Sequence, residues 1–214
     1  MDSPPVLPLV VALPRPARAS STRVHLGASE LVLEATRGGH SLMWSDGREA
    51  RRFSLGLAND GELALELRAP KWPLRVVVRE VLALAPRGRI RGYVQVPLVP
   101  TVTWNAAGET RVLIELPPRD LGVEWDEHEG SLCRCTSPWH ARVPMRSGEP
   151  RAVVPLHVRN ATAEVACPSH VPLRVVDEEL VELRGSIVGR PRRLVWTQGG
   201  FEDLPARTGA EIAQ

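Results

Sequence analysis

The residues best suited to chemistry gather in Leu121–Pro144, a stretch that holds two of the three cysteines and two of the six histidines. Thiolates from Cys133 and Cys135 and an imidazole from His128 or His140 are ligands that zinc and other transition metals accept. Structural zinc sites usually combine two such pairs, whereas this stretch has one Cys-x-Cys and no second cluster. We therefore predict no tightly bound metal, and we name these four residues as the ligands if one is held.

The cysteines allow three other interpretations, which the sequence leaves open. The simplest is that Cys133 and Cys135 are small buried residues, because free cysteine packs as a hydrophobe. A disulfide from either one to Cys167 is disfavoured by the odd cysteine count and by the lack of a secretion signal. A cysteine nucleophile activated by His140 is the third, but no neighbouring sequence has the pattern of an oxyanion hole.

The arginines that could bind an anion fall into two clusters, Arg87, Arg89 and Arg91 in one and Arg190, Arg192 and Arg193 in the other. Alternate residues share one face of a strand, so the first cluster would present its side chains together. If the two clusters meet in space, they form a patch that can hold phosphate. Aromatic residues for stacking are limited nearby to Tyr93 and Trp196, so we expect nucleic-acid binding to be the less favoured function.

Composition sets the class of protein. The chain has 214 residues, of which 43% are hydrophobic and 24% charged, as in a globular protein. A net charge of +2 gives no strong field toward nucleic acid or anionic lipid. The apolar segment Pro5–Pro14 is too short and proline-rich to span a membrane or to act as a secretory signal. We expect a cytoplasmic protein with reduced thiols and no cofactor.

Extended segments recur at roughly 8–12-residue spacing, separated by turns rich in Gly, Asn, Asp and Pro. No segment keeps helical periodicity for more than about three turns. The pattern predicts an all-β protein, an antiparallel β-sandwich of many short strands with under about a tenth of its residues helical. We expect an irregular proline-rich arm over 1–21 with a short edge strand at Leu9–Leu13, a sandwich domain over 22–200 with a sub-boundary near 117–120, and a tail over 201–214.

Several predicted strands lie around the cysteines. A hairpin is expected between Gly122 and Thr136, closed by Gly130, which can take a positive φ. Further strands are predicted at Trp139–Val143 and Thr162–Ala166, and Leu194–Thr197 is expected to end the ordered chain. Pro97 and Pro100 mark an edge strand or a crossing between sheets.

The segments Gly130–Cys135, Trp139–Pro144, Val154–Val158 and Arg159–Thr162 carry a family resemblance. They resemble the family called domain of unknown function 432, a group of uncharacterised proteins found mainly in archaea. Its members have a strand, an Asn-x-Thr unit and a second strand, which Asn160–Thr162 would match. Pro97–Pro100 stands where members carry an acidic segment, and this chain lacks the acid there. The resemblance covers the second half of the chain and implies no activity.

These observations favour a non-catalytic binding or assembly module over an enzyme. Many short strands leave sheet edges that can pair with a partner protein or with a second copy of the chain. Two alternatives remain at this stage, a metal-dependent enzyme on a β-barrel and a nucleic-acid binder that uses the arginine patch.

Overall fold

The structure is a computed structural model, and it describes residues 8–17, 20–56, 61–127, 130–144 and 148–204. This part of the chain contains eighteen strands and a single three-residue 3-10 helix. The strands form four sheets, which we name I to IV. The prediction of an all-β fold is confirmed, and the hydrophobic alternation that carried it explains why strands form throughout.

Sheets I and II have four strands each and are antiparallel throughout. Sheet I has the order β1 (Val10–Leu13), β6 (Glu62–Arg68), β9 (Val99–Ala106) and β10 (Glu109–Glu115). Sheet II has the order β2 (Ser21–Leu26), β3 (Ser29–Thr36), β4 (Gly39–Ser45) and β5 (Ala50–Leu55). The predicted edge strand near the N-terminus is β1, which pairs only with β6 among the described strands.

Sheets III and IV include the parallel pairings of the fold. Sheet III has the order β11 (Gly122–Asp126), β12 (Gly130–Ser137), β7 (Leu74–Val78) and β14 (Val171–Leu173). Sheet IV has the order β15 (Val181–Leu183), β16 (Ser186–Val188), β13 (Arg151–Asn160), β17 (Arg192–Thr197) and β18 (Gly200–Leu204), with β8 (Arg89–Pro97) also paired to β13. The 3-10 helix η1 (Asp177–Glu179) precedes β15. β12 runs parallel to β7, and β13 runs parallel to β16 and β17.

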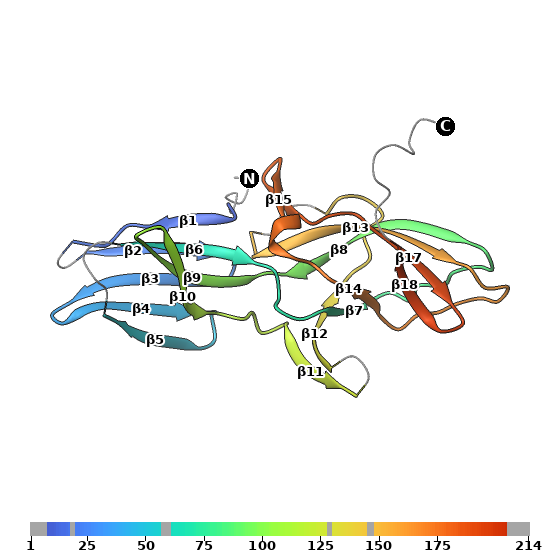
Figure 1. Cartoon of the computed structure of the whole chain (residues 1–214), viewed down its shortest axis with the longest axis horizontal. Coiled ribbons are helices and arrows are strands. Elements are labelled where there is room, and N and C mark those ends of the chain that lie inside the picture. Colours follow the sequence, from blue (N-terminus) through green and yellow to red (C-terminus); the bar gives the residue numbers. More distant parts are fainter. Residues whose placement is uncertain (1–7, 18–19, 57–60, 128–129, 145–147, 205–214) are drawn as a thin grey trace.

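Sheets I and II lie at one end of the elongated molecule, and sheets III and IV lie at the other (Figure 1). The chain crosses between the ends three times, from β6 to β7, from β8 to β9 and from β10 to β11. β8 and β9 are separated only by the fully buried Leu98, with Pro97 and Pro100 beside it, as expected for a crossing between sheets. Sheets III and IV therefore contain residues from both sides of 117–120.

The buried faces of all four sheets meet in one hydrophobic core, dominated by leucine and valine. Two sheets that bury facing sides in a common core at each end are the arrangement of a β-sandwich. In β13 the alternation of side chains places Leu156 and Val158 in the core and turns His157 and Arg159 to the opposite face. The same alternation buries Cys133 and Cys135 together on β12, and Gly130, at φ 75°, closes the predicted β11–β12 hairpin.

The strand predicted at Trp139–Val143 is wrong, because only His140 pairs, through a single bridge to Tyr93. The indole of Trp139 occupies the space above Gly92, where an added Cβ would lie 2.4 Å from Trp139 Cε2. The backbone N–H of Trp139 donates to Glu80 Oε2 at 2.7 Å, and this hydrogen bond is the main reason that the pKa of Glu80 is lowered. Packing over a glycine thus holds the segment where it cannot run beside a neighbouring strand.

The strand predicted at Thr162–Ala166 is also wrong, because the side chain of Asn160 turns the chain there. Asn160 Oδ1 accepts hydrogen bonds from the N–H and the hydroxyl of Thr162, at 2.9 and 2.8 Å. Such a side-chain turn offers the backbone an alternative to strand pairing. Only Ala166 pairs, through a bridge to Leu84.

The amide group of Asn160 also joins two distant parts of the chain. It is fully buried, and Nδ2 donates to the carbonyl oxygens of Leu84, Ala85 and Glu164 at 3.1, 3.1 and 2.7 Å. The backbone N–H of Asn160 donates to the carbonyl of Gly88 at 2.8 Å. These bonds fix the loop that leads into β8 against the end of β13.

The tail predicted from residue 201 begins as a strand, β18, which forms a hairpin with β17. Gly199 N donates to Thr197 Oγ1 at 3.2 Å, and Gly200 has a φ of 108°, so the turn depends on glycine. The rings of Trp196 and Phe201 meet edge to face, with centroids 5.0 Å apart. This contact holds the hairpin closed, and the rest of the predicted tail lies outside the described residues.

Candidate functional site

The outer face of sheet IV carries a cluster of basic side chains that we call the basic face, made of Arg89, Arg91, His157, Arg159 and Arg193. The register of β8 and β13 sets Arg89 opposite Arg159 and Arg91 opposite His157. The register of β13 and β17 sets His157 opposite Arg193. Directly opposed residues of neighbouring strands share a face, so all five side chains lie on one side of three adjacent strands. β8, β13 and β17 lie together in Figure 1.

The core forces these side chains outward. On the inner side of the same strands, Val94, Leu156 and Leu194 are almost completely buried. Since successive side chains point to opposite faces, the residues between the buried ones must face solvent. Burial of the apolar residues fixes the register of these three strands. The alternation of side chains then places the basic residues together on the outer face.

The arginines of the basic face are electrostatically unpaired. No ion pair joins Arg89, Arg91, Arg159 or Arg193 to a carboxylate in the described part of the chain. Many other arginines in the described ranges do form ion pairs with carboxylates, as Arg192 does with Glu179. The basic face thus concentrates positive charge on a protein whose net charge is only +2.

Positive charge on the basic face also acts on its histidine. The pKa of His157 is lowered from its ordinary value of 6.5, first by partial burial and then by repulsion from Arg91 and Arg193. Because this pKa lies below 6.5, His157 is mostly neutral at pH 7, and the arginines carry the positive charge of the basic face. The acidic residue on the same side of the sheet is Glu202 of β18, which lies opposite Val195.

The structure separates the predicted arginines into two groups. Arg89, Arg91 and Arg193 belong to the basic face, whereas Arg87 lies in the preceding turn at φ 59° and donates to the carbonyl of Ala161. Arg190 and Arg192 pair with Glu179 of η1, at 3.5 and 2.5 Å. These three arginines hold loops in place and do not join the basic face.

His157 and Arg159 were missed as site residues at the sequence level. The signal was present in the sequence, since the buried Leu156 and Val158 alternate with them in β13. Recognition required the knowledge that β13 continues to Asn160.

Cys133 and Cys135, which we named as ligands only if a metal is held, are core residues. Cys133 and Cys135 are each only 2% exposed, and burial raises the pKa of both thiols, that of Cys135 to about 12. His140 forms the bridge to Tyr93, and its Nε2 is buried without a hydrogen-bond partner among the described residues, while His128 lies outside them. Across the described ranges, no three His, Cys, Asp or Glu side chains group as a metal site would require.

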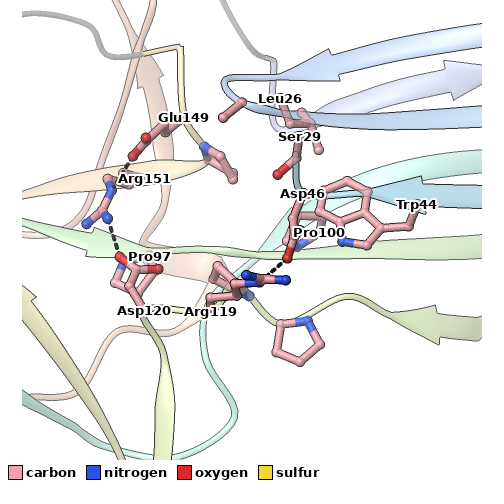
Figure 2. A pocket seen from close by; sticks show the side chains of 14 residues that line it. Leu26, Ser29, Trp44, Asp46, Pro97, Pro100, Arg119, Asp120, Glu149 and Arg151 are labelled. Atoms are coloured by element: carbon pink, nitrogen blue, oxygen red, sulfur yellow. Dashed lines mark hydrogen bonds and ion pairs between the residues drawn. The ribbon is translucent and has the colours of Figure 1, made fainter. Parts of the chain in front are cut away.

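A cavity of about 280 Å³ lies where the two ends of the molecule meet. Its apolar wall is formed by Leu26 and Trp44 from sheet II and by five prolines, Pro97, Pro100, Pro117, Pro118 and Pro150. Its charged wall contains Arg119 and Arg151 (Figure 2). Proline has no backbone N–H, so these five residues offer a ligand no backbone donor.

The charged side chains around this cavity are paired with one another. Arg151 binds Asp120 and also Glu149, the latter at 2.8 Å, and Arg119 binds Asp46 (Figure 2). Arg119 and Asp120 are neighbours in the link from β10 to β11. Arg119 forms an ion pair with Asp46, directly after β4 in sheet II, and Asp120 forms one with Arg151, in β13 of sheet IV. The cavity is therefore best explained as part of the junction that joins the two ends.

The described residues contain no helix with the length and apolar character needed to cross a membrane. Comparison with curated proteins and with solved structures found no match. A family model described as "Protein of unknown function (DUF432)" matches residues 15–192. The match confirms the resemblance seen in the second half and extends it through sheet II and all of sheet I except β1. The chain belongs to the DUF432 family.

Proposed function

We propose that this protein is a non-catalytic binding module whose basic face holds an acidic segment of a partner protein. The observation that carries the proposal is the set of four unpaired arginines, Arg89, Arg91, Arg159 and Arg193, on three adjacent strands. Like charges directly opposite one another in a sheet destabilise it. A ligand that brings carboxylates to this face removes the repulsion and gains charge-assisted hydrogen bonds.

The partner is better explained as a different protein than as a second copy. Two copies that met through the same surface would place the same basic side chains against each other, because a two-fold interface is self-complementary. Nucleic acid is less suited, because bases stack on several aromatic side chains and β8 has a single one, Tyr93. Trp196 is the register partner of the buried Asn160 and packs on Phe201, so it cannot stack on a base at the basic face.

Catalysis has weaker support in the described residues. Cys133 and Cys135 are buried and protonated, whereas a nucleophilic cysteine needs an accessible thiolate. The charged residues of the junction cavity are already paired with one another. All three cysteines are free, which supports the reducing cytoplasm as the location.

The test compares two baits of equal charge in affinity purification from native lysate. The basic-face variant replaces Arg89, Arg91, Arg159 and Arg193 with serine. The control variant replaces four exposed arginines elsewhere in the described residues that are paired on the surface, Arg23, Arg51, Arg52 and Arg111. Both variants lose four positive charges, so only the position of the charge differs.

We expect wild type and control to retain the same partner protein, and the basic-face variant to lose it. The retained partner should elute as salt is raised, because exposed charge pairs are screened. Equal retention by both variants contradicts the proposal. Nuclease treatment of the lysate gives the second discriminator, since loss of all binding after it points to nucleic acid.

A further inference from the structure

We infer that the acidic segment binds as an added strand, antiparallel to β8 along its free edge at Arg89–Arg91. The inference rests on the proposed function and specifies how the basic face holds its partner. It adds to the charge of the basic face a second, independent observation, the unpaired backbone of the same two residues.

Hydrogen-bond alternation shows which backbone groups of β8 are free. Gly88 O accepts from Asn160 N, so in the β8–β13 pair the even-numbered residues of β8 bond to β13. Odd-numbered residues therefore direct N–H and C=O to the other edge. Tyr93 follows this rule, since its N–H and C=O both bond to His140, at 2.8 and 3.0 Å.

The free edge is short and well defined. Gln95 N donates to Ser137 Oγ at 2.9 Å, so this edge is covered from Tyr93 onward. At Arg89 and Arg91 no described residue pairs with the outward N–H and C=O groups. An open edge of this kind binds an extended peptide through its main chain.

The side chains at this edge define the sequence class of the ligand. In an antiparallel pair, the residues opposite Arg89 and Arg91 exchange hydrogen bonds with them and point to the same face. Acidic residues at those two positions would meet the arginines directly. The residue between them lies on the side of the half-buried Ile90, where an apolar side chain is suited. The ligand is therefore an extended acid–apolar–acid segment.

The phosphate backbone of a nucleic acid cannot supply the same contacts at the edge. Phosphate oxygens accept hydrogen bonds from the N–H groups of Arg89 and Arg91, but they offer no donor to the carbonyl groups. A peptide backbone carries both a donor and an acceptor on each residue. The paired donors and acceptors of the edge thus favour peptide over nucleic acid.

The test uses the blocked heptapeptide Thr-Glu-Val-Glu-Val-Glu-Thr and two N-methylated forms. Methylation of the glutamate amides removes the donors that face β8, whereas methylation of the valine amides alters groups that face away. We expect the glutamate-methylated peptide to bind at least about 10-fold more weakly than the valine-methylated one, since the hydrogen bonds that the glutamate amides donate to the carbonyls of Arg89 and Arg91 are lost. Titration by calorimetry measures the ratio.

Amide hydrogen exchange locates the bound peptide. We expect the peptide to slow exchange at the amides of Arg89 and Arg91 and to leave Ile90, which already bonds to β13, unchanged. Equal binding of both methylated peptides, with loss of binding in the basic-face variant, overturns strand addition and leaves the proposed function standing. Absence of heptapeptide binding also overturns it, as does protection of both amides by a thymidine oligonucleotide with equal affinity. Failure of the proposed function is recognised separately, by equal retention of partners in the lysate comparison.

Discussion

Asn160 Nδ2 lies 3.1 Å from the carbonyl oxygen of Leu84, a residue 76 positions earlier in the chain. Asn160 is fully buried, and its amide group also holds Ala85 and Glu164. The bonds attach the loop before β8 to the end of β13, and both strands contribute to the basic face. Asn160, which is not part of the basic face, therefore sets the position of the arginines that we propose to bind the acidic segment.

Replacing Asn160 with alanine should lower the free energy of unfolding by about 3 kcal/mol, because three carbonyl groups lose a buried donor. Asn160→Asp should cost at least as much, since it removes the donor and adds a buried charge. Urea denaturation measures both. Asn105→Ala is the control, because Asn105 accepts a single bond from Thr110 at an exposed site, and its loss should be under about 0.5 kcal/mol. Equal losses at both sites contradict the structural role of Asn160.

Arg151→Met should destabilise the junction between the two ends by about 1–2 kcal/mol. The side chain of Arg151 is only 20% exposed and holds two carboxylates, Asp120 and Glu149, whose own exposure of 38% and 47% lets them recover part of their hydration. Arg111→Met is the control, because its pair with Glu109 is largely exposed and contributes about 0–0.5 kcal/mol. Thermal unfolding in parallel checks the difference, and equal midpoints would show that the link does not depend on this pair.

The thiols should react in two classes. Cys167 is exposed, whereas Cys133 and Cys135 are buried, and burial raises the pKa of Cys135 to about 12. At pH 8 a thiol-specific colour reagent should titrate one thiol of the native protein quickly and the other two only on unfolding. Cys167→Ser should abolish the fast reaction. Rapid reaction of more than one thiol in the folded wild type would contradict this assignment.

The same thiols predict how stability depends on alkaline pH. The unfolded chain releases thiol protons near the ordinary value of 9.0, while the folded chain keeps the proton on Cys135 until about 12. Folded protein therefore binds more protons in this window, so the free energy of unfolding should fall as pH rises from about 9 to about 12. Denaturation curves of wild type and Cys135→Ala measure the slope, which should be smaller in the variant.

The pKa of His157 should rise when Arg91 is replaced with serine, because the arginine opposes the protonated ring. Arg193→Ser should act in the same direction, and Arg23→Ser, in sheet II, should leave the pKa unchanged. Titration of the imidazole proton resonance by nuclear magnetic resonance gives the value directly. In the wild type, stability should decline as pH falls below about 6.5, because the unfolded histidine takes up its proton first.

The amino-acid sequence by itself determined the local structure. Alternation of apolar and polar residues specified strands, because burial of one face of a strand is decided within a few residues. It placed the β11–β12 hairpin with its closing Gly130 and put Cys133 and Cys135 on one face. It failed at Trp139–Val143, where packing against the distant Gly92 replaced strand pairing, and at Thr162–Ala166, where the side chain of Asn160 turned the chain.

Only the tertiary structure decided which strands meet. The basic face requires Arg91, His157 and Arg193 to be in register across β8, β13 and β17, and the parallel pairing of β13 and β17 carries no local signature. Register depends on the burial of whole strand faces and on long-range bonds such as that of Asn160 to Leu84. The sequence therefore determined that arginines face outward on strands, and the free energy of the assembled sheet determined which arginines are neighbours.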